Sequence, residues 1–369
     1  MTKLPRILFI LHFPPPMHGS AIVGGFLKKS KTINDTFECR YVNLGTSASI
    51  EEIGRNSIRK LLSYVSLIWQ VKKQLLINRP DLCYFTPTAA GPGFYKDALI
   101  ITIVKLFGIK TVFHYHNKGV INRQGLFIDN ILYRLAFKNT RVILLSKYLY
   151  PDIQKYVPEH RVYYCPNGIP DIQDKRKKEQ GKSNNSVTEI LFLSHLIRSK
   201  GILVLIDACS ILREKGIEFH CTVVGGDAEL KKRGLETIVT EKGLSSFISV
   251  VGPKHGDEKN ELMRSADIFV QPTYNDCMPL VFLEAMQYSL PIVSTPEGAI
   301  PDVVDDGVTG YLVPQRDAVT LAGKLEVLIR DADERVKMGA AGRSKYKRDF
   351  TLEKFEIRLK EIFEEVGSA

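Results

Sequence analysis

Several features that would assign this chain to a common class are missing from its sequence. Its apolar runs, such as residues 98–104, stop far short of the roughly 20 residues that a membrane-spanning helix needs. It has no G-x-x-x-x-G-K motif followed by Ser or Thr, and no G-x-G-x-x-G after a predicted strand. These absences exclude a P-loop ATPase and argue against a dinucleotide dehydrogenase. The apolar N-terminal segment has no small-residue cleavage site behind it, so we expect no signal peptide.

The six cysteines are scattered and form no C-x-x-C pair, so they indicate neither a zinc site nor a redox motif. Isolated cysteines are typical of a reducing compartment, and we expect a cytoplasmic protein. Asp331 and Asp333 are spaced like a metal-binding D-x-D pair. They lie in a polar segment with helical character, far from any predicted strand end, so we interpret them as solvated. We therefore expect no metal and no cofactor.

Charge is distributed unevenly along the chain. Residues 1–170 hold 23 Lys and Arg against 9 Asp and Glu, whereas the remainder holds 28 basic and 32 acidic residues. A basic N-terminal half predicts an anionic partner, either nucleic acid or a lipid headgroup surface. The segment 50–78 is amphipathic, with basic residues among apolar ones and the only tryptophan, Trp69. Because no RNP-like strand, zinc finger or helix-turn-helix is evident, we favour an anionic membrane over nucleic acid.

Short apolar runs alternate with helix-length amphipathic stretches along most of the chain, which predicts α/β structure with parallel sheets. The predicted strands of the first half are Arg6–Leu11, Cys39–Leu44, Leu82–Phe85, Lys110–His114, Arg141–Leu145 and Arg161–Cys165. Those of the second half are Glu189–Leu193, Glu218–Val224, Ile248–Val251, Ile268–Gln271 and Pro291–Ser294. The polar stretch between the two series predicts a linker, and ligands are expected in a cleft between two doubly wound domains.

The predicted division has four parts. A basic N-terminal domain covers residues 1–170, followed by a linker over 171–188. A C-terminal domain covers 189–345, and a final helix over 346–369 is expected to pack back on the N-terminal domain.

Two loops combine a strand end, a glycine and a helix start. Gly19 and Ser20 follow the first strand, where glycine allows close backbone approach and helix amides attract phosphate. The second loop carries His195, Arg198 and Lys200 before a helix that opens after it. Cations beside a helix start can cradle a diphosphate, although a turn glycine or a solvated basic loop is the structural alternative.

The most informative stretch is residues 271–294, where a strand ends and a helix begins near Pro279. Asp276 lies in the loop and Glu284 lies on the first turns of the helix. Backbone amides at the helix start can hold an anionic group, and the two carboxylates can accept hydrogen bonds from sugar hydroxyls.

This stretch resembles the E-x7-E region of family 4 glycosyltransferases, which are retaining enzymes with the GT-B fold. The resemblance extends to residues 191–201, which match the family's G-R-L-x-x-x-K-G, and to Ala266–Val270. It continues through residues 298–314, GAIPDVVDDGVTGYLVP, the counterpart of the family's G-x-x-E-x-V-x-D-G-x-T-G-x-L-V. The resemblance implies two Rossmann-like parallel-sheet domains that face each other across a cleft, with residues 1–170 as the acceptor-side domain and residues 189–345 as the nucleotide-sugar-binding domain.

The resemblance also implies roles for individual residues. Glu284 would hold the nucleotide ribose, Asp276 would contact donor-sugar hydroxyls, and Lys200 would bind the phosphates. Gly19 would approach the donor closely, and His116, after a predicted strand, matches the family's histidine near the reacting sugar. The backbone that would hold the sugar and diphosphate belongs to Cys277, Met278, Pro279, Leu280 and Val281.

Three positions depart from the family pattern. Asp276 replaces the first glutamate and is one methylene shorter, and His195 replaces the arginine of G-R-L, whose role Arg198 could take. Met278 and Pro279 replace the Phe-Gly pair, and proline removes one backbone donor.

The function that the resemblance implies is metal-independent transfer of a sugar from a UDP- or GDP-sugar to a saccharide acceptor, with retention. A lipid-linked acceptor in bacterial surface polysaccharide or lipopolysaccharide assembly is the favoured expectation, with the enzyme peripheral on the inner face of the membrane. Two alternatives stay open, another GT-B enzyme such as a sugar-nucleotide epimerase, and a non-catalytic nucleotide-sugar or membrane-binding protein.

Overall fold

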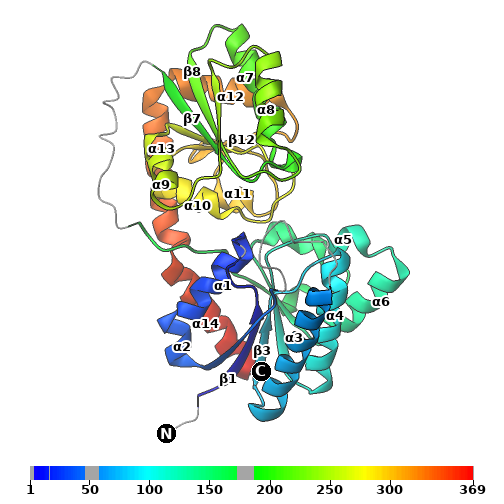
Figure 1. Ribbon diagram of the computed structural model, residues 1–369. Coiled ribbons are helices and arrows are strands. Elements are labelled where there is room, and N and C mark those ends of the chain that lie inside the picture. The colour runs from blue at the N-terminus through cyan, green and yellow to red at the C-terminus, as the bar shows by residue number, and fades with distance from the viewer. Residues whose placement is uncertain (1–3, 16, 46–57, 173–186, 369) are drawn as a thin grey trace. The chain divides into compact units, whose positions relative to one another are not determined.

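The computed structural model describes residues 4–15, 17–45, 58–172 and 187–368 (Figure 1). The chain forms two compact units, residues 1–168 with 352–369, and residues 169–351. Most of the expected linker lies outside the described residues, as do residues 50–57 of the predicted amphipathic segment.

The first unit is built on a six-stranded parallel sheet in the order β2-β1-β3-β4-β5-β6. Its strands are β1 (Arg6–Leu11), β2 (Glu38–Asn43), β3 (Leu82–Phe85), β4 (Lys110–Tyr115), β5 (Arg141–Leu144) and β6 (Val162–Tyr164). All four residues of β3 are buried, as expected of an apolar strand that is covered on both faces. The predicted strands are confirmed with shifts of one residue at several ends.

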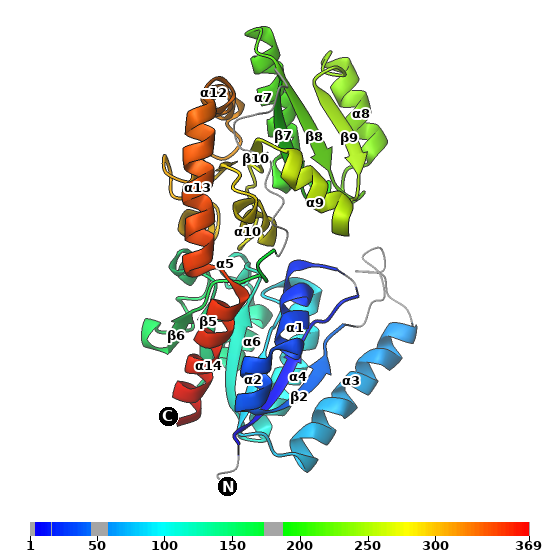
Figure 2. The same cartoon turned by 90° about the vertical axis from the view of Figure 1, so that its left-hand side faces the viewer.

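Helices cover both faces of this sheet. They are α1 (Gly19–Lys29), α2 (Lys31–Thr36), α3 (Ile58–Ile77), α4 (Gly91–Leu106), α5 (Val120–Arg123), α6 (Phe127–Phe137) and α14 (Leu352–Ser368). The short 3₁₀ turns are η2 (Lys147–Asp152) and η3 (Glu159–Arg161). Helices α1, α2 and α14 lie on one face, and α3, α4 and α6 lie on the other (Figures 1 and 2).

The last helix of the chain, α14, completes the core of the first unit. Its Phe363 ring meets the rings of Phe9 and Tyr84 edge to face, with centroids 5.8 and 5.4 Å apart. Phe37 contacts the same ring at 5.9 Å. Residues more than 270 positions apart in the sequence therefore share one aromatic cluster.

The second unit repeats the design with the sheet order β12-β11-β10-β7-β8-β9, again fully parallel. Its strands are β7 (Thr188–Leu193), β8 (Phe219–Val224), β9 (Ile248–Gly252), β10 (Ile268–Val270), β11 (Ile292–Ser294) and β12 (Gly310–Leu312). Its helices are η4 (Arg198–Lys200), α7 (Ile202–Glu214), α8 (Lys232–Glu241), α9 (Gly256–Ser265), α10 (Leu280–Gln287), α11 (Ile300–Val303), α12 (Ala318–Arg330) and α13 (Ala332–Asp349). Strand β12 was not among the predicted strands.

The domain boundary expected between residues 345 and 346 falls inside helix α13, and the chain changes unit only after Thr351. Tyr346 explains the difference, because it is fully buried within the second unit. Its hydroxyl donates to the Ile169 carbonyl at 2.8 Å and accepts from the Gln287 amide at 2.7 Å. The end of α13 is thus anchored where the sequence predicted a break.

Both sheet orders reverse direction next to the first strand of each unit. In the first unit the chain runs from β1 outward to β2 and then returns to the other side of β1 with β3. In the second unit β8 lies on one side of β7 and β10 on the other. Ligands in doubly wound sheets bind at such points, beyond the carboxyl ends of the strands. The loops that follow β1, β7 and β10 are therefore the places to look for a site.

Candidate functional site

The loops after β7 and β10 are joined by hydrogen bonds. The Ser199 carbonyl accepts from the Tyr274 amide at 2.8 Å and from the Thr273 hydroxyl at 3.0 Å. Both strands are neighbours in the sheet, so their carboxyl ends meet at one edge. The two segments that the sequence singled out for donor binding thus form one structure in the second unit.

Gly201 makes this junction sterically possible. Its φ is +83°, in the left-handed region that favours glycine, and it caps η4 before α7 begins. A Cβ at this position would collide with the carbonyl oxygen of Pro272. The Lys-Gly pair at positions 200 and 201 therefore sets how closely the two loops approach.

Lys200 and Asp276 form the central ion pair of this edge. The ammonium Nζ lies 2.5 Å from Asp276 Oδ2 and also donates to the Asn275 carbonyl at 3.4 Å. The two side chains are only 21% and 15% exposed, so water screens the pair less than it screens a surface pair. The structure brings together two residues that the sequence predicted to act on one ligand.

The backbone around Asp276 is more fully engaged than the sequence suggested. The Cys277 amide, expected to be available to a ligand, donates to Asp276 Oδ1 at 2.9 Å. The Asp276 amide donates to Glu297 Oε1 at 3.2 Å, and the Gln315 side-chain amide donates to Glu297 Oε2 at 2.9 Å. Sequence analysis missed Glu297, a buried carboxylate that follows β11 at the same sheet edge. Glu297 could have been identified from the sequence because it lies only three residues after the end of β11.

Gly298 closes this loop against the Asp276 backbone. Its φ is +55°, and a Cβ there would lie 2.5 Å from the Asp276 carbonyl oxygen and 2.6 Å from that of Cys277. The Ala299 amide donates to the Cys277 carbonyl at 2.6 Å. Segments 276–277 and 297–299 are therefore packed against each other at this edge of the sheet.

Helix α10 begins immediately after this loop, with Pro279 as its N-cap. Leu280 and Val281 occupy its first two positions, where amides have no partner within the helix. Glu284 follows on the next turn and forms an ion pair with Lys259 of α9, with Oε1 and Nζ 2.8 Å apart. Sequence analysis did not identify Lys259, whose place opposite Glu284 depends on how α9 and α10 pack.

The side chains of Cys277, Met278 and Pro279 are buried in the second unit. These three residues can therefore act on a ligand only through their backbone. Met278 and Pro279, which stand where the family has Phe and Gly, are part of the core at the base of α10.

His195 and Arg198 lie in the loop after β7 and differ in their surroundings. Burial, the Lys200 charge and His255 lower the pKa of His195 below its ordinary value, so the ring is neutral at pH 7. A neutral imidazole cannot supply the charge of the arginine that it replaces. Arg198 remains charged but pairs with Glu229, with Nε and Oε1 3.1 Å apart and both side chains about half exposed. Lys200 is the more shielded cation of this loop.

His116 follows β4 in the first unit and belongs to a histidine cluster. Its ring lies 4.2 Å from that of His114, which is hydrogen-bonded through Nδ1 to the Tyr84 hydroxyl at 2.7 Å. Burial, followed by the charge of His12, lowers the pKa of His116 to about 4. Burial also lowers the pKa of His12 to about 4, with a contribution from His18. The cluster is neutral at pH 7, and sequence analysis identified His116 alone.

Gly19 and Ser20 open helix α1, whose N-cap is His18. The Ser20 hydroxyl is hydrogen-bonded to His18 Nδ1 at 3.0 Å, and the Ala21 amide donates to the same nitrogen at 3.4 Å. A Cβ on Gly19 would meet no atom within 4 Å, whereas one on Gly24 would collide with the His12 carbonyl. Packing within the unit therefore requires glycine at position 24 and leaves space around Gly19.

Asp331, the first member of the expected solvated pair, is the N-cap of α13. Its Oδ1 accepts from the Glu334 amide at 2.9 Å, and Asp333 lies in the first helical turn. Both positions are explained by helix capping and the helix dipole. Within the part of the chain that the structure describes, no three His, Cys, Asp or Glu residues are grouped so as to hold a metal ion.

A comparison with family models matches residues 173–345 to "Glycosyl transferases group 1". The match covers somewhat less than half of the chain, and this part of it is similar to the group 1 glycosyl transferases. The match contains the loops after β7, β10 and β11 and helix α10, that is, every site element described above in the second unit. The family resemblance of the sequence motifs is thereby confirmed.

Two curated relatives, AmsK and WcaL, are similar to about half of the chain. The amylovoran biosynthesis glycosyltransferase AmsK of Erwinia amylovora is 32% identical over 48% of this chain and 45% of its own length. WcaL of Escherichia coli, named as a colanic acid biosynthesis glycosyltransferase, is 30% identical over the same shares. The chain thus spans less than half the length of these relatives. A Methanocaldococcus jannaschii glycosyltransferase is 27% identical over 68% of this chain and 67% of its own.

Solved structures resemble the chain over nearly its whole length. Sucrose-phosphate synthase from Thermosynechococcus elongatus has a TM-score of 0.75 at 18% identity and covers 99% of this chain and 100% of its own. Anabaena HepE in complex with UDP and glucose has a TM-score of 0.71 at 16% identity over 98% of this chain and 99% of its own. WaaG, a glycosyltransferase involved in lipopolysaccharide biosynthesis, has a TM-score of 0.66 at 16% identity and covers 97% of this chain and 98% of its own. These likenesses confirm the expected GT-B fold.

Proposed function

We propose that this chain is a glycosyltransferase that moves a sugar from a nucleoside diphosphate donor to a saccharide hydroxyl with retention of configuration. The observation that carries the proposal is the edge formed by Lys200, Asp276 and Glu284 inside the group 1 region. One cation, two carboxylates and a helix start lie at the reversal point of the sheet order. This set suits a ligand that carries a diphosphate and several hydroxyls.

In the proposed reaction the bond between the anomeric carbon and the donor diphosphate breaks. A bond from the acceptor oxygen forms on the same face of the sugar. The acceptor proton passes to an oxygen of the departing diphosphate, which thereby acts as the base. Lys200 and the amides of Leu280 and Val281 stabilise the charge that develops on the leaving group. We therefore expect activity without an added metal ion.

The donor side of the proposal rests on the second unit. Asp276, held by Lys200, is assigned to the hydroxyls of the donor sugar, and Glu284 to the ribose. UDP is the first nucleotide to test, because structurally similar HepE was solved with UDP and with UDP-glucose. His116 and the space around Gly19 in the first unit are assigned to the reacting sugar and its acceptor.

The acceptor side of the proposal rests on charge and on the named relatives. AmsK and WcaL are named for the exopolysaccharides amylovoran and colanic acid, so we propose a role in bacterial surface polysaccharide assembly. We further propose a lipid-linked saccharide acceptor and a cytoplasmic enzyme that is peripheral on the anionic inner face of the membrane. None of the described helices is both long enough and apolar enough to cross a bilayer.

Helix α3 supplies the surface for that membrane association. Leu67, Val71 and Leu75 are buried against the first unit, while Leu62 and Trp69 are exposed. The exposed side of α3 also carries Lys72 and Lys73. Apolar side chains flanked by lysines can enter the boundary between headgroups and acyl chains of an anionic bilayer.

The test is calorimetric titration of the protein with UDP, GDP, ADP and CMP, with EDTA present. Selective binding of UDP or GDP, followed by transfer from the matching nucleotide sugar to a saccharide acceptor, is the expected result. A sugar-nucleotide epimerase would change the donor without any acceptor. No binding by the folded protein would overturn the assignment of the donor site.

A further inference from the structure

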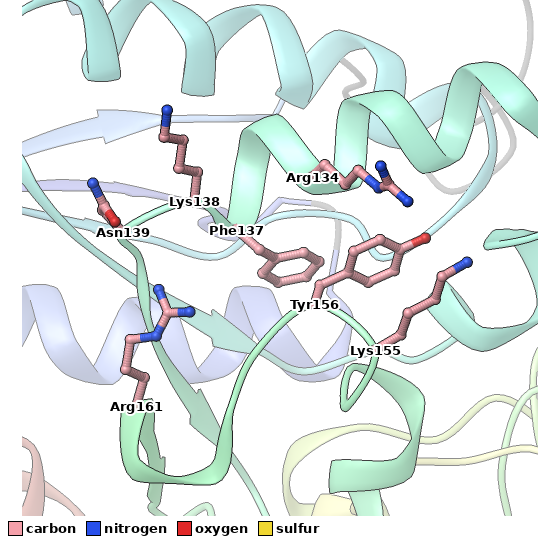
Figure 3. Close-up of a pocket in the computed structure, with 7 residues that line it drawn as sticks. All are labelled: Arg134, Phe137, Lys138, Asn139, Lys155, Tyr156 and Arg161. Atoms are coloured by element: carbon pink, nitrogen blue, oxygen red, sulfur yellow. The ribbon is translucent and has the colours of Figure 1, made fainter.

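An open pocket of about 330 Å³ lies in the first unit (Figure 3). Its lining residues come from the end of α6, from the turn between α6 and β5, and from the segment between η2 and β6. Its lining consists of four cationic residues, one amide and two aromatic rings, namely Arg134, Lys138, Lys155, Arg161, Asn139, Phe137 and Tyr156. No carboxylate contributes to the lining.

The two rings form a fixed apolar floor. Phe137 and Tyr156 stack with centroids 5.7 Å apart and an interplanar angle of 16°. The Tyr156 hydroxyl donates to Asn130 Oδ1 at 2.8 Å, which holds the ring in place. Figure 3 shows Arg161 on one side of the rings and Arg134 and Lys155 on the other. The cations thus surround a rigid centre.

The positive charge of this pocket is not neutralised within the described part of the chain. Arg134, Lys138 and Arg161 make no ion pair with any described carboxylate, and Lys155 donates to the Gln124 carbonyl at 3.0 Å. Asp129 of α6 is 1% exposed and is paired instead with Arg123, at 3.1 Å.

The positive charges of the pocket also affect the pKa of a neighbouring lysine, Lys105. Lys105 Nζ donates to the Lys138 carbonyl at 2.5 Å and to the Thr140 hydroxyl at 2.8 Å. Burial, and then the charges of Arg161 and Lys138, lower the pKa of Lys105 to about 8. Like charges that are held together without a carboxylate destabilise the chain unless an anion offsets them.

We propose that this pocket is a binding site for a phosphate group, separate from the proposed donor site. Arginine guanidinium groups match phosphate oxygens in bidentate geometry, and lysines add charge without a fixed direction. The Asn139 amide supplies a neutral donor at the same rim. Two sources of phosphate fit this chemistry, the headgroup of an anionic phospholipid and a free phosphate or diphosphate.

The exposed surface of α6 helps to distinguish between these two sources of phosphate. Phe127, Ile131 and Leu135 recur every four residues and are all exposed, with Phe127 at 79%. Arg134 and Lys138 of the pocket lie on or directly after the same helix. A phosphate at the pocket with acyl chains beside the apolar row would engage both features of α6. The lipid arm of this inference rests on the membrane association proposed above, and the phosphate site itself does not.

The experiment compares the full-length protein with Arg134→Gln/Arg161→Gln and with a charge-matched control, Lys29→Gln/Lys31→Gln. Both control lysines are exposed residues of the α1–α2 region. One arm titrates pyrophosphate by calorimetry with saturating UDP present, so that the proposed donor site is occupied. The other measures co-sedimentation with vesicles of phosphatidylglycerol in phosphatidylcholine. Thermal unfolding of all three proteins verifies that they are folded.

The pocket variant should lose affinity about tenfold or more in at least one arm, while the control retains it. Loss in the vesicle arm identifies a lipid headgroup as the source, and loss in the pyrophosphate arm alone identifies a free phosphate. Equal behaviour of the two variants in both arms overturns the inference. UDP binding and sugar transfer are measured separately, so failure of the proposed function would be distinguished from failure of this site.

Discussion

The Lys200 ammonium lies 2.5 Å from the Asp276 carboxylate and joins the loop after β7 to the loop after β10. The pair lies at the junction that the close approach of Gly201 to Pro272 permits. A donor diphosphate at this edge would share Lys200 with Asp276, whose other oxygen already accepts from the Cys277 amide. If Asp276 contacts the donor sugar as proposed, its orientation toward that sugar would depend on Lys200.

Lys200→Ala should lower the affinity for UDP by about tenfold or more, because a charge-assisted contact contributes about 1.5–3 kcal/mol. The change also leaves the Asp276 carboxylate unpaired beside the diphosphate. The double variant Lys200→Ala/Asp276→Asn should therefore bind UDP better than Lys200→Ala alone. Calorimetry measures the UDP affinity of the native protein and of the two variants. Lys215→Ala is the control, since Lys215 forms an ion pair with Glu326 away from the proposed site. Equal affinity of Lys200→Ala and the native protein would contradict the assignment.

Glu284→Gln should weaken binding of UDP about tenfold while leaving binding of pyrophosphate unchanged, because the carboxylate is assigned to ribose hydroxyls. The matched control is Lys259→Met, which breaks the same 2.8 Å ion pair and keeps the carboxylate. If loss of the ion pair were the cause, the two variants would lose UDP affinity equally. Titration of each variant with UDP and with pyrophosphate separates the two explanations.

Gly201→Ala should destabilise the second unit by about 2 kcal/mol or more, because the new Cβ combines a positive φ with a collision against the Pro272 carbonyl. Gly216→Ala is the control, since Gly216 also has a positive φ, +68°, but a Cβ there meets nothing within 4 Å. The Gly216→Ala change should lower the free energy of unfolding by only about 1 kcal/mol. Urea denaturation measures both. A similar cost for the two variants would show that the junction tolerates a side chain.

Trp69 is the only tryptophan and is 62% exposed on α3, so its fluorescence reports directly on membrane contact. Vesicles containing phosphatidylglycerol should shift its emission to shorter wavelength, and vesicles of phosphatidylcholine alone should not. Lys72→Gln/Lys73→Gln should weaken binding to the anionic vesicles roughly thirtyfold, at about 1 kcal/mol per charge. Co-sedimentation without a spectral shift would mean that α3 is not the contacting surface.

The sequence predicted most of the sheet and part of the site, for physical reasons that differ. Strands such as Leu82–Phe85 were found because a strand buried on both faces is a continuous apolar run. Strand β12 (Gly310–Leu312) was not predicted because it begins with glycine, which is depleted in strands. That glycine is required by the neighbouring strand, where a Cβ would collide with the Ile292 carbonyl.

At the site, Asp276, Glu284 and Lys200 were identified because each lies near a strand end or a helix start. Their partners Lys259 and Glu297 were not, since those contacts join segments 25 and 21 residues away through tertiary packing. No local periodicity encodes which cation faces Glu284. The same reason explains His12 and His18, which join His116 only through the adjacency of loops in the fold.

The histidine cluster should make the first unit sensitive to acid. His12 and His116 have pKa values of about 4 in the folded chain, below the ordinary 6.5, so the unfolded chain binds more protons between these limits. Stability should therefore fall as the pH drops from 6.5 toward 4, by about 1 kcal/mol per histidine per pH unit. Asp97 acts in the opposite sense, because burial raises its pKa to about 6 and protonation then favours the folded state.

The comparison that isolates the histidines is the native protein against His12→Gln/His116→Gln, with Asp97 unchanged in both. Urea unfolding at pH 7.5 and at pH 5 should show a smaller loss of stability in the variant, by about 4 kcal/mol. Equal losses would mean that these rings can be protonated without unfolding, through rearrangement of the loops after β1 and β4. That result would leave charged imidazoles in the loops after β1 and β4 at low pH.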